Sequence, residues 1–207
     1  MSIFQIDSPF YDTLRRLTEL IILNLLWLIF SVPLITIGAS TAAMYAVLMR
    51  EDKESSTIKR FWRAFWSNLK SSFPLTLIMA CLAIIAWIAY LIFLAGDMSK
   101  IQISDVPPAL LILMFFCVNS YVWPLYAQFE NTTGQIIKNA LLLALAHFPT
   151  SLLMAALNMV PIVWLLYATQ SFMKFLMIWL LIGFAAIASL CVRMLKPILL
   201  KHMTQEE

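Results

Sequence analysis

Charge is what this sequence lacks most. Only 12% of its 207 residues are Asp, Glu, Lys or Arg, whereas 62% are hydrophobic. Soluble domains carry about 25% charged residues, which they need to cover a surface that faces water. The shortage excludes a soluble domain with one anchor. It predicts an all-α polytopic membrane protein that forms a single integral membrane domain over residues 1–207.

Signatures of catalysis and metal binding are missing as well. The sequence contains no H-E-x-x-H, G-x-S-x-G or G-x-x-x-x-G-K-[ST] motif. Cys81, Cys117 and Cys191 lie in apolar runs without C-x-x-C spacing, which is typical of packed thiols rather than metal ligands. We therefore expect no enzymatic activity, no cofactor or metal, and no nucleic-acid partner.

Five apolar runs approach or exceed the roughly 20 residues that a helix needs to cross a bilayer. They cover residues 20–49, 73–95, 106–127, 139–166 and 175–192. These runs predict about five transmembrane helices, with an N-terminal segment at 1–19 and a tail at 193–207. The lipid bilayer is then the first partner of the chain.

Basic residues are distributed unevenly between the runs. The first connection holds six, namely Arg50, Lys53, Lys59, Arg60, Arg63 and Lys70, whereas the next holds only Lys100. The positive-inside rule places the first connection and the C-terminal tail in the cytoplasm. Five spans would put the N-terminus outside. Arg15 and Arg16 favour the opposite side, which a re-entrant hairpin within 20–49 would allow.

The first apolar run is interrupted by an amide and two helix breakers, Asn24, Pro33 and Gly38. Proline removes a backbone donor and bends a helix, while glycine and the alanines after it allow close packing. Two interpretations remain open, one bent span over 20–49 or a re-entrant hairpin. Because no charge lies nearby, we favour a bend with helix packing over a ligand site.

The connection between the first two runs combines rings with cations. Phe61, Trp62, Phe65 and Trp66 fall on one helical stripe, and Arg63 and Lys70 lie outside it, which predicts a cytoplasmic interfacial helix over 54–72. Such a helix can place its rings at headgroup depth and its cations toward anionic lipid. The alternative is docking to a protein partner through the same rings.

Three further polar residues lie at membrane depth: Asn119, His147 and Asn158. We expect the amides of Asn24, Asn119 and Asn158 to join helices by interhelical hydrogen bonds. Intramembrane ionisable groups are functional candidates. However, the runs hold no carboxylate to complete a proton relay, so we favour a structural hydrogen bond for His147.

An internal similarity links two parts of the chain. "SSFPLTLIMA" at 71–80 matches "AHFPTSLLMA" at 146–155, including the Phe-Pro pair of each. The match predicts a two-fold repeat of a connector followed by a span, in the same orientation. Chance similarity in a leucine-rich chain is the alternative.

Three segments taken together resemble the YesL family of bacterial integral membrane proteins: "NLLWLIFSVPLITIGASTAAMY", "FWRAFWSNLKSSF" and "YVWPLYAQFENTTGQIIKNALLLALAHFP". The matching positions are Asn24, Trp27, Pro33, Thr36, Gly38, Ala39, Phe61, Phe65, Asn68, Lys70, Pro124, Leu125, Ala127, Phe129, Glu130, Asn131, Thr132, Lys138, Asn139 and Ala140. The resemblance extends over almost the whole chain. It implies a domain of unknown function, often encoded beside carbohydrate-uptake ABC transporters and polysaccharide-utilisation genes, and it implies no site residues.

Two functions follow as hypotheses. The first is a non-enzymatic accessory or scaffold subunit for carbohydrate ABC uptake or polysaccharide utilisation, with ABC permease subunits as its membrane partner. The second is a small stand-alone transporter or channel, because interrupted helices in repeated halves can mark a substrate site.

Overall fold

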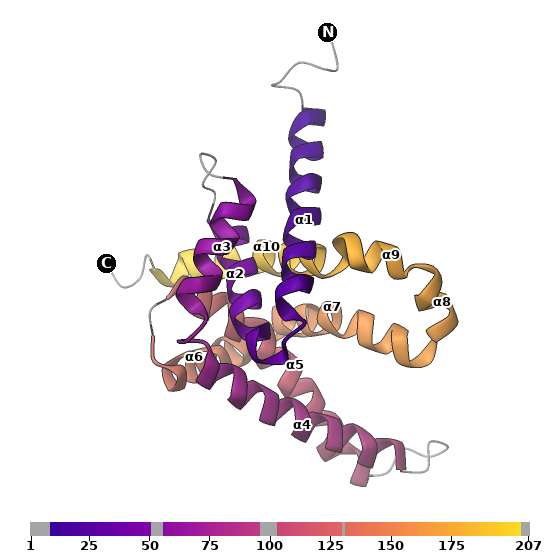
Figure 1. Cartoon of the computed structure of the whole chain (residues 1–207). Helices are drawn as coiled ribbons and strands as arrows, with labels where there is room; N and C mark the ends of the chain where they lie inside the picture. Colours follow the sequence, from indigo (N-terminus) through magenta and orange to yellow (C-terminus); the bar gives the residue numbers. More distant parts are fainter. Residues whose placement is uncertain (1–8, 51–55, 96–102, 130, 204–207) are drawn as a thin grey trace.

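The computed structural model describes residues 9–50, 56–95, 103–129 and 131–203. Within these ranges all regular elements are helical, which confirms the all-α prediction (Figure 1). In chain order they are α1 (Pro9–Ser31), η1 (Leu34–Thr36), α2 (Ile37–Met49), α3 (Thr57–Asn68), α4 (Phe73–Ala95), η2 (Ile103–Asp105), α5 (Val106–Gln128), α6 (Thr133–Ala146), α7 (Phe148–Tyr167), α8 (Thr169–Lys174), α9 (Leu176–Ile178), η3 (Trp179–Gly183) and α10 (Phe184–Met203).

Four helical segments of the described chain are long and apolar enough to cross a membrane: Phe73–Leu94, Ile103–Gln128, Phe148–Tyr167 and Leu176–Leu200. Their apolar side chains point outward as well as inward; Ile84 and Ile85 of α4, for example, are exposed. A helix that is apolar on all sides needs lipid or protein around it. The chain is therefore a multi-pass membrane protein with four candidate spans by length and composition, rather than the five expected.

The first apolar run forms a helical hairpin. α1 ends at Ser31 and α2 begins at Ile37, with η1 in the turn between them. Ser31 Oγ lies 2.6 Å from Ser40 Oγ, and Trp27 Nε1 donates to Thr41 Oγ1 at 3.0 Å. These contacts hold α2 back against α1. The run is therefore two helices packed side by side rather than one bent helix, and a re-entrant position in the membrane stays a prediction.

Pro33 and Thr36 explain why the chain reverses instead of bending. Pro33 has no N–H to continue α1, and its backbone is extended, with φ −76° and ψ 113°. The Thr36 hydroxyl lies 2.6 Å from the carbonyl of Phe30 and 2.8 Å from that of Pro33. Thr36 thus supplies a donor at the C-terminal end of α1, where the helical ladder leaves carbonyls without partners.

The fourth apolar run is divided. The span expected over 139–166 breaks at His147, which separates α6 from α7. Pro149 has no N–H to donate to the carbonyl of Leu145, and its ring would clash with that carbonyl in a continuous helix. The helix therefore breaks at His147, with φ −118° and ψ 48°, and Pro149 lies in the first turn of α7, where proline is tolerated. α6 is an apolar helix of 14 residues, shorter than a span, and only α7 is long enough to cross.

Two other expected boundaries also differ. The fifth run does not stop at residue 192, because α10 continues to Met203 and occupies most of the expected tail 193–207. Residues 204–207 lie outside the described chain. The connector helix expected over 54–72 is α3, Thr57–Asn68, followed by a turn before α4, and residues 54 and 55 lie outside the description.

The repeated sequence occupies matching places in the fold. Phe73-Pro74 begins α4 and Phe148-Pro149 begins α7, and each long helix follows a shorter one. The hydroxyls of Thr76 and Ser151 both donate to the carbonyl four residues earlier, at 2.8 and 3.0 Å. α2–α3–α4 and α5–α6–α7 therefore have the same helix order, with α2 and α5 in contact at the centre.

α2 lies at the core of the molecule. It packs against α1, α3, α5 and α10, and its residues from Gly38 to Val47 are buried except for the half-buried Thr41. A Cβ on Gly38 would stand 1.8 Å from Thr76 Oγ1 and 2.9 Å from Trp123 Cη2. Gly38 is therefore a point where α2 approaches α4 and α5 too closely for a larger side chain.

Candidate functional site

α3 presents different aromatic residues on its two sides. Phe61 and Phe65 are 0% and 4% exposed, and their rings pack against Phe30 of α1 with centroids 5.8 and 4.7 Å away. Trp62 and Trp66 are 49% and 54% exposed, with centroids 5.7 Å apart, although Trp62 also meets the Phe30 ring edge-on at 5.6 Å. The stripe expected to lie at the lipid surface is thus divided. We call Trp62 and Trp66 the tryptophan face.

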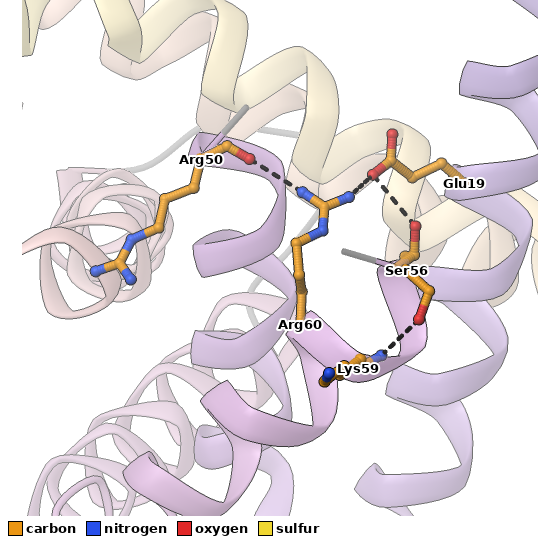
Figure 2. A network of polar contacts seen from close by, with 6 residues as sticks. Glu19, Arg50, Ser56, Lys59 and Arg60 are labelled. Carbon is orange, nitrogen blue, oxygen red and sulfur yellow. Dashed lines mark hydrogen bonds and ion pairs between the residues drawn. The ribbon is translucent and has the colours of Figure 1, made fainter. Parts of the chain in front are cut away.

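The N-terminal turn of α3 is fixed by polar contacts. Ser56 Oγ accepts from the Lys59 amide at 3.4 Å and caps the helix. Arg60 forms an ion pair with Glu19 of α1, and its Nη1 donates at 3.1 Å to the carbonyl of Arg50, at the end of α2 (Figure 2). One guanidinium therefore ties α3 to both helices of the hairpin.

A polar cavity of about 330 Å³ lies between α2, α3 and the C-terminal end of α5. Three arginines line it, Arg50, Arg60 and Arg63, and we call it the arginine pocket. The other lining residues are Ala46, Val47, Ala64, Ser67, Asn68, Tyr126, Ala127, Gln128 and Phe129. Arg63, expected to face anionic lipid, thus faces this cavity, whereas Lys70 is exposed in the turn before α4.

A second cavity of about 440 Å³ lies between α4, α5 and α7. Its lining is apolar apart from tyrosine hydroxyls and includes Trp87, Tyr90, Phe116, Val163 and Tyr167. Neither cavity could be identified from the sequence, because each is formed by residues from helices far apart along the chain.

Asn24 joins α1 to the interrupted last helix. It is completely buried, and its amide nitrogen donates to the carbonyls of Trp179 and Leu180 at 3.1 and 2.7 Å. Its Oδ1 accepts from the Ala185 amide at 2.9 Å. Residues Trp179–Gly183 form a π-helix, η3, and π-helical turns disturb the regular hydrogen-bond ladder. Asn24 supplies partners where that ladder is disturbed.

The other expected polar residues differ in their contacts. Asn158 of α7 donates to Ser120 Oγ of α5 at 3.1 Å and approaches Cys191 Sγ of α10 at 3.6 Å, so it joins three helices. The bond described for Asn119 is intrahelical, from Trp123 Nε1 at 3.2 Å, which differs from the expected interhelical one. His147 lies at the junction of α6 and α7, and its carbonyl accepts from the Ser151 amide and hydroxyl.

Pro33, Gly38 and Asn24 therefore act in separate places. Pro33 lies in the hairpin turn, Gly38 at the contact of α2 with α4 and α5, and Asn24 at η3. They do not converge on one cavity. In the described part of the chain, no group of three or more His, Cys, Asp or Glu side chains could hold a metal ion.

The comparisons with known proteins give one family match and no function. A family model described as "Protein of unknown function, DUF624" matches residues 20–90, which is less than half of the chain. No curated protein and no solved structure gives a significant match. The similar region contains the second half of α1, α2, α3 and most of α4, and therefore both members of the tryptophan face and the three arginines of the pocket.

Proposed function

We propose that the protein is a non-enzymatic accessory or scaffold subunit that binds a membrane partner through the tryptophan face of α3. The observation that carries this proposal is the division of the aromatic residues. Phe61 and Phe65 hold α3 in the core, while Trp62 and Trp66 remain about half exposed beside one another. Tryptophan is among the residues that contribute most to binding at protein interfaces.

The way α3 is held supports a binding role. Two contacts fix α3 on the hairpin. Arg60 forms an ion pair with Glu19, and Phe30 of α1 packs against the phenylalanines of α3. A side chain presented on a fixed helix loses less conformational freedom on binding than one on a loose connector. The tryptophan face is therefore a preorganised surface of small area.

The partner we propose is a permease subunit of a carbohydrate-uptake ABC transporter in the bacterial plasma membrane. The resemblance of the sequence segments to the YesL family supports it, because genes of that family often lie beside such transporters. The DUF624 match over residues 20–90 is consistent with that family and carries no function of its own. The proposed cytoplasmic side of α3 and of the C-terminus follows from the positive-inside rule. Such a partner would meet the tryptophan face at the cytoplasmic boundary of the membrane.

Co-purification tests this proposal. We expect Trp62→Ala/Trp66→Ala to reduce recovery of permease subunits by about tenfold or more from cells grown on an inducing sugar, because tryptophan hot spots contribute about 2 kcal/mol or more each. Ile84→Ala/Ile85→Ala is the matched control, since both side chains are exposed on a candidate span. Equal recovery with wild type and the tryptophan variant would contradict the proposal.

A stand-alone transporter or channel is the second candidate function. The repeated helix order favours it, because repeated halves can place a substrate site at their interface. The π-helical interruption of the last candidate span lies outside the repeat and adds a second irregular helix. Liposomes containing the purified protein would then show flux of a sugar or ion. Absence of flux across a panel of both would contradict it.

A further inference from the structure

The arginine pocket concentrates positive charge in a bounded space. Arg50, Arg60 and Arg63 line it from two elements, and Glu19 is the carboxylate that the described contacts place against one of them. Among the described residues, those four side chains carry a surplus of two positive charges. A cavity with such a surplus attracts an anion, and low-dielectric walls strengthen the attraction.

We propose that the arginine pocket binds a phosphate group. Guanidinium groups present paired donors that match phosphate oxygens, and such charge-assisted bonds are stronger than neutral ones. The volume of about 330 Å³ is at the small end of the range for ligand pockets, which suits a phosphate or a phosphate-bearing headgroup. This site is separate from the proposed partner surface and does not depend on it.

The three arginines have different roles in the proposed site. Arg60 is 14% exposed, and its terminal nitrogens already serve Glu19 and the Arg50 carbonyl, so it is a positioning residue. Arg50 and Arg63 are exposed at the cavity and supply the donors for phosphate. Figure 2 shows the Arg50 side chain running away from Arg60, so the two guanidinium groups are spread apart.

The neutral walls of the cavity are held by internal bonds. The Tyr126 hydroxyl donates to Ser71 Oγ at 2.7 Å, and the Asn68 amide donates to the Ala64 carbonyl at 2.7 Å. These bonds fix the wall on which the anion would rest. Ser71 lies in the turn before α4, so its bond with Tyr126 links this wall of the pocket to the segment that leads into a candidate span.

The phosphate could come from an anionic lipid headgroup or from a free phosphate, since α5 ends beside the cavity and is itself a candidate span. Titration of the full chain in phosphate-free detergent separates the two. One arm uses inorganic phosphate, and the other uses short-chain phosphatidylglycerol in mixed micelles. Saturable binding in either arm supports the site, and the arm that binds more tightly identifies the source.

Variants test whether the pocket itself binds. We expect Arg50→Gln and Arg63→Gln each to weaken binding about tenfold, because each removes charge-assisted bonds. Arg63→Lys keeps the charge without the paired donors and should give an intermediate loss. Lys59→Gln removes the same charge from an exposed position of α3 outside the pocket and should leave binding unchanged.

Two results would overturn the proposal. One is the lack of saturable binding in both arms. The other is an equal loss with Lys59→Gln and Arg63→Gln, which would mean diffuse attraction to a basic helix. If Arg50→Gln fails to fold, Arg63→Gln still tests the site, because the Arg63 side chain is exposed at the cavity rather than buried in the core.

Discussion

Replacing Asn24 with alanine is expected to lower the free energy of unfolding by about 2–3 kcal/mol, since buried polar bonds between membrane helices contribute about 1 kcal/mol each. Asn24 has three such bonds, to the carbonyls of Trp179 and Leu180 and to the amide of Ala185. All three backbone groups belong to the π-helical turn or the residues that follow it. When the Asn24 side chain is removed, these two carbonyls and one amide lose a hydrogen-bond partner in a place where the helical ladder is disturbed.

The free energy can be measured by SDS-dependent unfolding of the purified protein in mixed micelles. Asn119→Ala is the matched control, because the bond described for Asn119 stays within its own helix. We expect that control to cost less than about 1 kcal/mol. Equal losses for the two variants would mean that Asn24 does not stabilise the joint between α1 and η3.

Replacing Gly38 with alanine is expected to destabilise the protein by about 1–2 kcal/mol. The new Cβ would overlap Thr76 Oγ1 and press on the Trp123 ring, and overpacking of this kind costs about 1–3 kcal/mol. A contact of 1.8 Å belongs in the upper part of that range, and the helix preference of alanine offsets about 0.5–1 kcal/mol of it, which leaves about 1–2 kcal/mol. The same unfolding assay measures the net result.

Gly134→Ala gives the opposite sign and serves as the control. A Cβ at Gly134 of α6 meets no atom within 4 Å, so only the helix preference remains, a gain of roughly 0.5 kcal/mol. Thr76→Ala introduced together with Gly38→Ala should recover part of the loss. A neutral Gly38→Ala would show that α2 does not approach α4 and α5 as closely as described.

The helical, membrane-embedded character of the chain could be predicted because it depends on composition and on the length of apolar runs. The path of the first run could not. The sequence marks Pro33 as a helix breaker, but a proline is found both where a helix bends and where the chain reverses. The two differ in whether the second helix packs back against the first. That choice is made by contacts such as Ser31 with Ser40 and Trp27 with Thr41.

The candidate site was predictable in part for the same reason. Helical spacing places Phe61, Trp62, Phe65 and Trp66 on one broad side of α3, but it cannot say where a neighbouring helix divides that side. The packing of α3 against α1 makes the division. The Phe30 ring contacts Phe61, Trp62 and Phe65, but only the two phenylalanines are buried and both tryptophans stay about half exposed. Spacing alone also could not place Arg63 beside residues of α5.

A tryptophan pair at a membrane boundary has two physical uses. Its rings can rest among lipid headgroups, or they can fill a pocket on a protein. The exposure of Trp62 and Trp66 is compatible with both, and the two uses differ in what touches the rings in an intact membrane. We propose that a protein partner touches them.

Site-specific photo-cross-linking in cells therefore tests the central claim most directly. A photoreactive residue replaces Trp66 in one variant and Ile84, exposed on the candidate span α4, in the other. We predict a covalent adduct with a transporter permease subunit from position 66 and only lipid adducts from position 84. Lipid adducts alone at both positions would contradict a partner surface on α3 and assign the tryptophan face to the bilayer.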